Sequence, residues 1–273
     1  AHLRGQAAMV EQARIRVRLF EIGPDDRCAI FSPPSFTGAL NNLVMAIATG
    51  LSMFLGLDRR LDEERIRDVL DDVAATYTSI TPSLFRHLAG ERRPGEGFGG
   101  LRWIQLSGES VRAADVAIFN AINDGMTRLR VSWGSTEAGT LTTGELEPAL
   151  AARTGPLPVG VSLPGVEVVV VDDGGGSVTD GKLGRILVRS GNLSVPESDD
   201  PIRTRRMLLA DRPDPERPWL DTSDSGWRES DGRIVISERT DLDLKIGGVR
   251  IDGADLERRL SSIRGVGDVA VVC

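Results

Sequence analysis

The sequence predicts an α/β fold in which parallel sheet layers are covered by helices, followed by a small antiparallel β-barrel and the start of a small α+β C-terminal subdomain. Up to Ser132, short apolar runs alternate with helix-like segments, a pattern typical of parallel strands joined by helices. From Gly155 onward, β-rich runs follow one another without helices between them, which indicates antiparallel strands.

The composition is that of a globular protein with a sizeable core. The chain has 273 residues, 40% of them hydrophobic and 27% charged, which suits one large domain or two modest ones. Its net charge of -7 argues against nucleic acid as a partner, because phosphate binding requires a basic surface. No apolar run approaches the ~20 residues of a membrane span, so we expect no membrane partner. The cysteines, Cys28 and Cys273, form no Cys-x-x-Cys pair, which indicates reduced thiols and a cytoplasmic location.

Residues 6–20 have apolar positions near helical spacing, although the alternation of Ile15, Val17 and Leu19 would also suit a strand. Pro82 stands at the first position of a helix, where proline is tolerated. In the first half of the chain, further helices are expected at 36–50, 58–72, from 82, and 111–122, and strands at 27–32, 52–55, 76–81, 103–106 and 129–132.

The second half is expected to be mainly β. The triple glycine within 172–176 predicts a hairpin tip and not a phosphate loop, because no helix follows it. Residues 230–233 carry a second hairpin signal. The other expected elements are strands at 165–171 and 185–189, an exposed connection at 197–218 with a short helix at 202–209, and a final strand, helix and strand at 249–251, 253–262 and 268–272.

A polar cluster follows the strand at 129–132. Ser135 and Thr136 can donate to phosphate oxygens, Glu137 offers the hard oxygen that Mg²⁺ prefers, and Trp133 offers a flat face for a purine base. Ligands of parallel sheets bind at the carboxyl ends of the strands, where this cluster and Ser107 both stand. An ordinary polar turn is the alternative interpretation of these residues.

Residues 131–139 resemble the Tyr-Gly-x-Thr-Glu signature of the adenylate-forming enzymes, which include acyl-CoA synthetases, luciferases and the adenylation domains of nonribosomal peptide synthetases. The resemblance implies ATP-dependent activation of a carboxylic acid as an acyl-adenylate, then transfer to a carrier-protein phosphopantetheine thiol or to CoA. The peptide-synthetase branch is the most similar. Other segments resemble the family's motifs in the same order: Leu106–Ser110, Gly184–Gly191, Asp221–Asp224, Glu238–Asp241 and Lys245–Ile251.

The resemblance also implies roles for single residues. Thr136 would contact the phosphate and Glu137 would bind Mg²⁺, as the catalytic pair. Trp133 would stack on adenine, and Asp224 and Arg239 would contact the ribose. The implied nucleotide-binding set is Gly108, Glu109, Ser110, Trp133, Gly134, Ser135, Asp224 and Arg239.

The acyl pocket follows from the same resemblance. Thr37 stands where amino-acid-activating relatives have the Asp that holds an α-ammonium group, so we expect a carboxylic acid other than an ordinary α-amino acid. Asp241 matches the hinge position, and Lys245 and Gly248 match the thioester tunnel. The implied pocket residues are Phe36, Thr37, Gly38, Asn41, Gln105, Ser107, Ser132, Thr140 and Leu141.

Several departures from the family pattern qualify this prediction. Ser223 and Glu238 stand where the family has glycine, and the sequence contains neither the Ser-Gly-Thr-Thr-Gly phosphate loop nor the late lysine. We therefore expect an incomplete adenylation core at 1–240 and the beginning of a C-terminal subdomain at 241–273. The chain is either a piece of a longer protein or a shortened relative, and efficient adenylation by it as given is not expected. A catalytically degenerate binding or scaffold module is the alternative.

Overall fold

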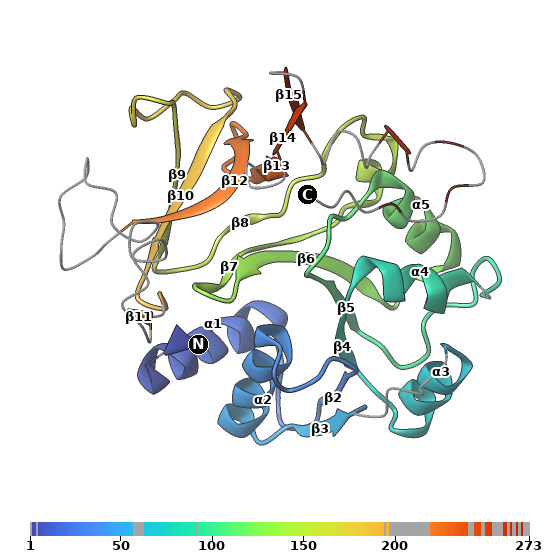
Figure 1. Ribbon diagram of the computed structural model, residues 1–273. Helices are drawn as coiled ribbons and strands as arrows, with labels where there is room; N and C mark the ends of the chain where they lie inside the picture. The colour runs from blue at the N-terminus through green and yellow to red at the C-terminus, as the bar shows by residue number, and fades with distance from the viewer. Residues whose placement is uncertain are drawn as a thin grey trace.

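The computed structural model describes most of the chain and is shown as a ribbon in Figure 1. For residues 2–3, 63–64, 195–196, 238–239, 243–246 and 249–252, only the backbone is described. The described residues are 2–3, 5–56, 63–90, 92–193, 195–196, 219–239, 243–246, 249–252, 259–260, 263, 266 and 269.

The largest sheet of the described structure has seven strands, in the order β3-β2-β4-β5-β6-β7-β8 (Figure 1). The strands from β3 to β6 are parallel, whereas β7 and β8 are antiparallel to their neighbours. The bounds are β2 Arg27–Ile30, β3 Ser52–Leu55, β4 Tyr77–Ile80, β5 Trp103–Leu106, β6 Arg128–Ser135, β7 Gly139–Glu145 and β8 Val161–Ser162.

Helices cover both faces of this sheet. Helices α1 (Gln6–Phe20) and α2 (Thr37–Thr49) pack on the face that carries Tyr77 and Trp103. The opposite face carries Ile80 and Ile104, which pack with the helices α3 (Glu63–Asp72), α4 (Pro82–Gly90) and α5 (Ala113–Ile122). Successive strand residues alternate between the two faces because the side-chain period of a strand is two. Both faces are therefore buried, as parallel sheets require.

A second, four-stranded antiparallel sheet is curled into a half-barrel, with the order β13-β12-β10-β9. Backbone hydrogen bonds join it to the segment before β8: Val159 N donates to Ile234 O at 2.8 Å, and Ile234 N donates to Gly160 O at 2.8 Å. These bonds bring the antiparallel sheet against the larger one. The bounds are β9 Val166–Val171, β10 Gly184–Ser190, β12 Leu220–Arg228 and β13 Ile234–Arg239.

Smaller elements complete the described structure. A 3₁₀ helix, η1, spans Pro148–Ala152. The two short pairs are β1 (His2–Leu3) with β11 (Val195–Pro196), and β14 (Asp243–Ile246) with β15 (Val249–Asp252). None of the described helices has the length and apolar composition needed to cross a membrane.

The predicted fold class is confirmed, with two local corrections. α1 is helical throughout, so the strand alternative for its second half is wrong; helical spacing puts Arg16 and Phe20 on its buried side. β6 continues to Ser135 instead of ending at Ser132, because it pairs with β7, a strand that the sequence did not predict. The short helix expected at 202–209 lies outside the described residues, as do most of the helix at 253–262 and most of the strand at 268–272.

Gly134 is required by the close approach of β7 to β6. A Cβ atom at this position would lie 1.9 Å from Gly139 O, and that oxygen belongs to backbone that cannot swing away. We expect Gly134→Ala to lower the free energy of unfolding by about 1–3 kcal/mol, the usual cost of overpacking. Denaturant unfolding measures this.

Gly90→Ala is the matched control, because a Cβ atom there meets nothing within 4 Å. A Gly134→Ala protein as stable as the Gly90→Ala protein would contradict the close approach.

Candidate functional site

Two predicted site residues from different sheets are hydrogen-bonded to each other. Trp133 Nε1, on β6, donates to Asp224 Oδ2, on β12, at 3.0 Å. The carboxylate of Asp224 belongs to a residue only 6% exposed, so it needs such a donor to offset lost hydration. The indole ring packs against the core of the antiparallel sheet. The structure thus brings the predicted base platform and the predicted ribose acceptor together.

A local turn holds Asp224 in place. Ser223 N donates to Asp221 Oδ1 at 2.9 Å, and Asp224 N donates to Thr222 Oγ1 at 3.2 Å. Asp221 is also paired with Arg185 at 2.8 Å. Ser223 has a φ of 60°, in the left-handed region that favours glycine. The position where the family has glycine therefore keeps the glycine conformation although its residue is serine.

The turn between β6 and β7 carries the predicted catalytic pair. Thr136 is exposed and Glu137 is half-buried, and both lie in the turn at 136–138. Ser135 Oγ is buried and has no hydrogen-bond partner within the described residues. A buried hydroxyl of this kind costs free energy unless a ligand or water satisfies it. The arrangement therefore fits a phosphate oxygen that accepts hydrogen bonds from the hydroxyls of Ser135 and Thr136.

The described residues contain no group of three or more His, Cys, Asp or Glu side chains that could hold a metal ion. Glu137 can still supply one oxygen ligand, because Mg²⁺ is commonly bound through one or two carboxylates together with substrate phosphates. A nucleotide-dependent Mg²⁺ site fits this turn, whereas a site built entirely of protein groups does not.

The loop after β5 places Glu109 against a helix. Glu109 Oε2 accepts from Ser83 N at 3.0 Å, and Glu109 Oε1 accepts from Ser83 Oγ at 2.6 Å. Thr81 Oγ1 accepts from Leu84 N at 3.3 Å in the same turn. Glu109 therefore caps the N-terminus of α4, where a carboxylate is favoured. Gly108, with a φ of 88°, and Ser110 flank it and are exposed.

The predicted acyl-pocket residues differ in their exposure. Asn41, Gln105, Ser132 and Leu141 are buried, whereas Phe36 is 63% exposed. Gln105 Nε2 donates to Ser132 Oγ at 2.8 Å. The remaining members, Thr37, Gly38, Ser107 and Thr140, are exposed or partly exposed.

Sequence reasoning missed three buried polar residues, Arg16, Asn42 and Tyr77, that are linked by hydrogen bonds to Gln105. Arg16 Nη2 donates to Asn42 Oδ1 at 2.7 Å and to Tyr77 Oη at 2.9 Å. Tyr77 Oη in turn donates to Gln105 Oε1 at 2.9 Å. The available signal was the spacing of Gln12 and Arg16, which puts both on the same face of α1 as its buried apolar residues.

Four predicted residues near the C-terminus are described only in part. The backbone of Arg239 is the partner of Asp224 in the β12–β13 register, and Lys245 lies in β14 opposite Arg250. Asp241 and Gly248 lie outside the described residues.

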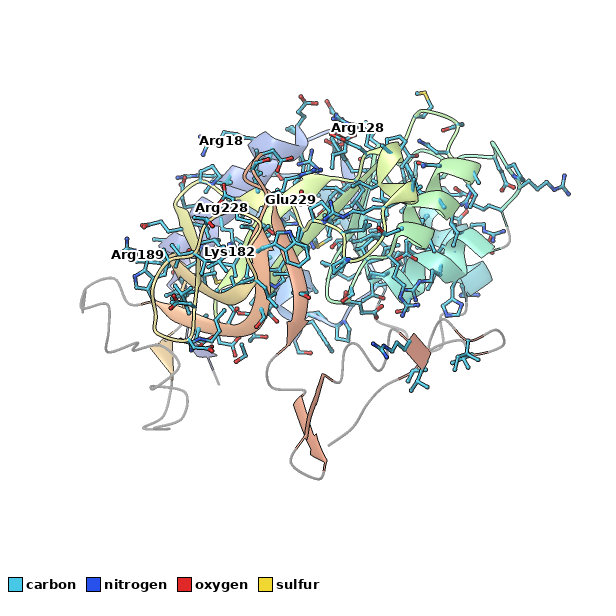
Figure 2. The ribbon with its side chains drawn as sticks, turned by 90° about the horizontal axis from the view of Figure 1, so that it is seen from above. Arg18, Arg128, Lys182, Arg189, Arg228 and Glu229 are labelled. Atoms are coloured by element: carbon cyan, nitrogen blue, oxygen red, sulfur yellow. The ribbon has the colours of Figure 1, made fainter. Side chains whose placement is uncertain are left out.

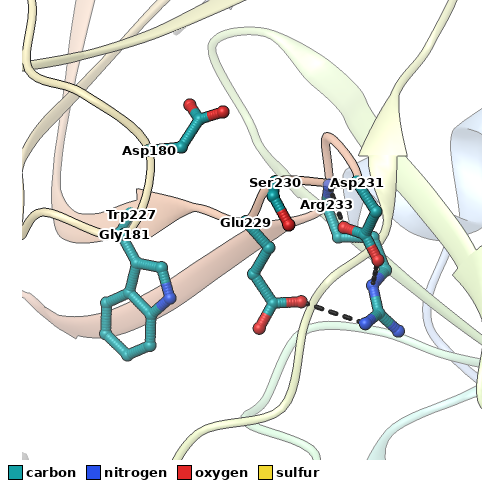
Figure 3. A pocket seen from close by; sticks show the side chains of 7 residues that line it. All are labelled: Asp180, Gly181, Trp227, Glu229, Ser230, Asp231 and Arg233. Atoms are coloured by element: carbon teal, nitrogen blue, oxygen red, sulfur yellow. Dashed lines mark hydrogen bonds and ion pairs between the residues drawn. The ribbon is translucent and has the colours of Figure 1, made fainter.

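A pocket of about 420 Å³ opens at the β12–β13 hairpin and contains none of the predicted site residues (Figure 3). Its acidic side chains are all paired with arginine. Asp180 pairs with Arg228 at 2.9 Å, and Asp231 pairs with Arg233 at 2.7 Å. Glu229 pairs with Arg153 at 2.8 Å and Arg233 at 3.1 Å. These ion pairs join η1 to the hairpin and leave the pocket without an excess of charge.

Comparison with known proteins gives a consistent result. The model of the family described as AMP-binding enzyme matches residues 1–194. Chondramide synthase cmdD of Chondromyces crocatus is 27% identical over 268 residues, which cover 95% of this chain and 7% of that protein. The L-proline–[L-prolyl-carrier protein] ligase of Streptomyces coelicolor is 24% identical, over 92% of this chain and 47% of that protein.

Solved structures are similar in fold. The crystal structure of CmiS6 has a TM-score of 0.78 and 28% identity, over 87% of this chain and 58% of that chain. O-succinylbenzoate coenzyme A synthetase (MenE) from Bacillus subtilis, in complex with AMP, has a TM-score of 0.79 and 20% identity, over 98% and 52%. The chain thus spans 52% to 58% of these two solved chains, and less than half of the two curated relatives.

The left-handed conformation of Ser223 gives a testable consequence. Because a Cβ atom disfavours this conformation, Ser223→Gly should raise the free energy of unfolding by up to about 1 kcal/mol, after the added chain entropy of glycine is subtracted. Denaturant unfolding of the pure protein checks the sign.

Ser162→Gly, in β8, is the control, since Ser162 does not have a positive φ. Glycine there should lower stability. Equal destabilisation by both substitutions would contradict the strain at Ser223.

Proposed function

The chain belongs to the family of AMP-binding enzymes, the adenylate-forming enzymes, and from this premise we propose that it activates a carboxylic acid with ATP. In the proposed reaction a carboxylate oxygen attacks the α-phosphorus of ATP, the acyl-adenylate forms, and pyrophosphate leaves. The hydrogen bond between Trp133 and Asp224 is the observation that carries the proposal. It joins the proposed base platform to the proposed ribose acceptor across two sheets.

The reaction brings two anions together, so alignment and charge compensation matter more than a general base. Thr136 and Ser135 are proposed to donate to phosphate oxygens, since the buried Ser135 hydroxyl has no hydrogen-bond partner among the described residues. Glu137 is proposed to hold the Mg²⁺ that would offset phosphate charge. Asp224 is proposed to accept from the ribose hydroxyls and Trp133 to stack on adenine, with Arg239 as a second ribose contact.

The second half-reaction is proposed to deliver the acyl group to a carrier-protein thiol or to CoA. A carrier protein is favoured by similarity to a protein named as a prolyl-carrier protein ligase and to synthetases of the chondramide and pyochelin type. Thr37 in place of an aspartate supports an acid other than an ordinary α-amino acid. Asp241, Lys245 and Gly248 stay predicted hinge and tunnel residues.

A non-catalytic binding or scaffold role is the alternative. The observation that favours it is that the Asp224 carboxylate already accepts a hydrogen bond from the indole, so the ribose would have to share or displace that contact. The binding of a non-hydrolysable acyl-adenylate mimic, measured without turnover, separates the two alternatives.

Removal of the proposed hydrogen-bond donor to phosphate and of the proposed metal ligand tests the catalytic role. We expect Thr136→Ala with Glu137→Ala to reduce carboxylate-dependent ATP–pyrophosphate exchange at least about 100-fold, since each group acts on charge that develops in the transition state. The exchange assay uses the full-length protein and a broad panel of acids.

Glu147→Ala is the control, because Glu147 is an exposed residue that precedes η1 and lies outside the proposed site. Exchange that survives the double substitution would place the phosphate elsewhere. No exchange with any acid by the native full-length protein would reject the activation reaction itself.

Asp224→Asn tests the ribose contact without turnover. The amide keeps the shape of the side chain but weakens its hydrogen-bond acceptance, so a non-hydrolysable acyl-adenylate mimic should bind about tenfold or more weakly. Isothermal titration measures the affinity.

Asp231→Asn, in the hairpin pocket, should leave that affinity unchanged. Absence of mimic binding to the native protein would favour the scaffold role, and equal binding to both variants would remove Asp224 from the nucleotide site.

A further inference from the structure

A buried arginine is hydrogen-bonded into the side chains of the proposed acyl pocket. Arg16, on α1, is only 2% exposed, and its Nη2 donates to Asn42 and to Tyr77. Its Nε is buried and has no hydrogen-bond partner within the described residues. A guanidinium stays charged in proteins and cannot accept a hydrogen bond. Arg16 therefore brings a full positive charge into the interior.

The described residues provide Arg16 with no carboxylate partner. Its acceptors, Asn42 and Tyr77, are both neutral groups. Burial raises the pKa of Tyr77 to about 12, and burial also raises the pKa of the nearby Cys28 to about 12. Both groups are therefore protonated and uncharged at neutral pH. A buried charge without a counter-ion is costly, which makes this arginine unusual for a purely structural residue.

A second buried arginine, Arg130, likewise has an Nε without a hydrogen-bond partner among the described residues, but its surroundings differ. Arg130 stacks on Phe20 at 4.5 Å and on Trp103 at 4.4 Å, measured from its guanidinium carbon to the ring centroids. Burial lowers the pKa of Arg130, and the charge of Glu145 opposes that effect. Arg130 thus has a carboxylate within electrostatic reach as well as aromatic faces. Arg16 has one such face, Phe20, at 5.8 Å.

The shorter hydrogen bonds beyond Arg16 run in one direction, because the nearer acceptor of the single Tyr77 hydroxyl proton is Gln105 Oε1 at 2.9 Å and the farther one is Asn42 Oδ1 at 3.3 Å. Arg16 donates to Tyr77, Tyr77 donates to Gln105 Oε1, and Gln105 Nε2 donates to Ser132 Oγ at 2.8 Å. Each bond strengthens the next, because a donor that accepts from a cation becomes a better donor. Ser132, the last group of this series, accepts at its oxygen, so its hydroxyl proton can be donated to an acceptor outside the network. A ligand that reaches Ser132 therefore meets a donor with a buried cation behind it.

We propose that Arg16 makes the acyl pocket selective for a carboxylic acid that carries a second anionic group, a dicarboxylic acid being the simplest example. The proposal rests on the proposed function, since it names the substrate class of the same site. One carboxylate reacts at the nucleotide, and the other is received at the Arg16–Tyr77–Gln105–Ser132 network. The second anion supplies the counter-charge that the described residues do not give Arg16.

Isothermal titration of the full-length protein with a dicarboxylic acid and with its monomethyl ester tests the proposal without turnover. The native protein should bind the dicarboxylate about tenfold or more tightly than the ester of equal length, the effect of one charge-assisted contact. Arg16→Met should abolish the preference by removing the cation at similar side-chain length.

Asn42→Asp is the second variant, for the case that Arg16→Met does not fold. It places a carboxylate at the position whose oxygen now lies 2.7 Å from Arg16 Nη2, at the loss of the bond from Asn42 Nδ2 to Gly38 O at 2.9 Å, so it should supply the counter-charge internally and remove the preference for the dicarboxylate. A purely structural Arg16 predicts a folded Asn42→Asp protein with the preference unchanged.

Arg18→Met is the matched control on the same helix, because Arg18 is exposed and pairs with Glu11 at 3.5 Å (Figure 2). It should leave the preference intact. A native protein that binds neither acid, binds both equally, or keeps its preference in a folded Arg16→Met or Asn42→Asp variant overturns the proposal. Dicarboxylate binding that persists without ATP–pyrophosphate exchange would instead reject the proposed function and leave the selectivity standing.

Discussion

The docking of the antiparallel sheet against the parallel sheet is the constraint on which the candidate site depends. The backbone bonds of Val159 and Gly160 with Ile234 hold the two sheets together. Only this arrangement lets Trp133, at the end of β6, reach Asp224, on β12. These two residues are separated by 91 positions, so their contact is a product of topology and not of local sequence. Loss of sheet docking would remove the site while leaving each sheet's own hydrogen bonds in place.

Two local backbone features stand near the contact between Trp133 and Asp224. Gly134 allows β7 to pass close to β6, and the left-handed Ser223 turns the chain so that Asp224 faces the indole. Both features lie next to groups that are proposed to bind the nucleotide. The left-handed conformation of Ser223 persists only where the surrounding structure enforces it, here through the Asp221 and Thr222 hydrogen bonds.

Much of the fold was predictable because its signals are local. The alternation of apolar strands and amphipathic helices identified the parallel layers, and the helix-free β runs identified the antiparallel sheet. β7 was missed because its sequence is rich in threonine and glycine and lacks a strong apolar pattern, so its pairing with β6 defines it. Motif resemblance predicted Trp133 and Asp224 as members of one nucleotide site, but it did not predict the hydrogen bond between them. The capping role of Glu109 was not predicted, because it depends on Ser83 from a different segment.

The polar network of Arg16 lay beyond sequence reasoning for a related physical reason. A charged residue on an amphipathic helix is ordinarily assigned to solvent, and only the packing of α1 on the sheet shows that Arg16 is buried. Its charge also bears on Thr37, from which the sequence indicated an acid other than an ordinary α-amino acid but did not indicate which one. A pocket for an α-ammonium group needs an internal carboxylate, and this chain has Thr37 where relatives have one. If Thr37 does occupy the position of that carboxylate, the proposed pocket lacks a negative charge there and has the charge of Arg16 behind it, and both differences favour the proposed ligand with an additional anion.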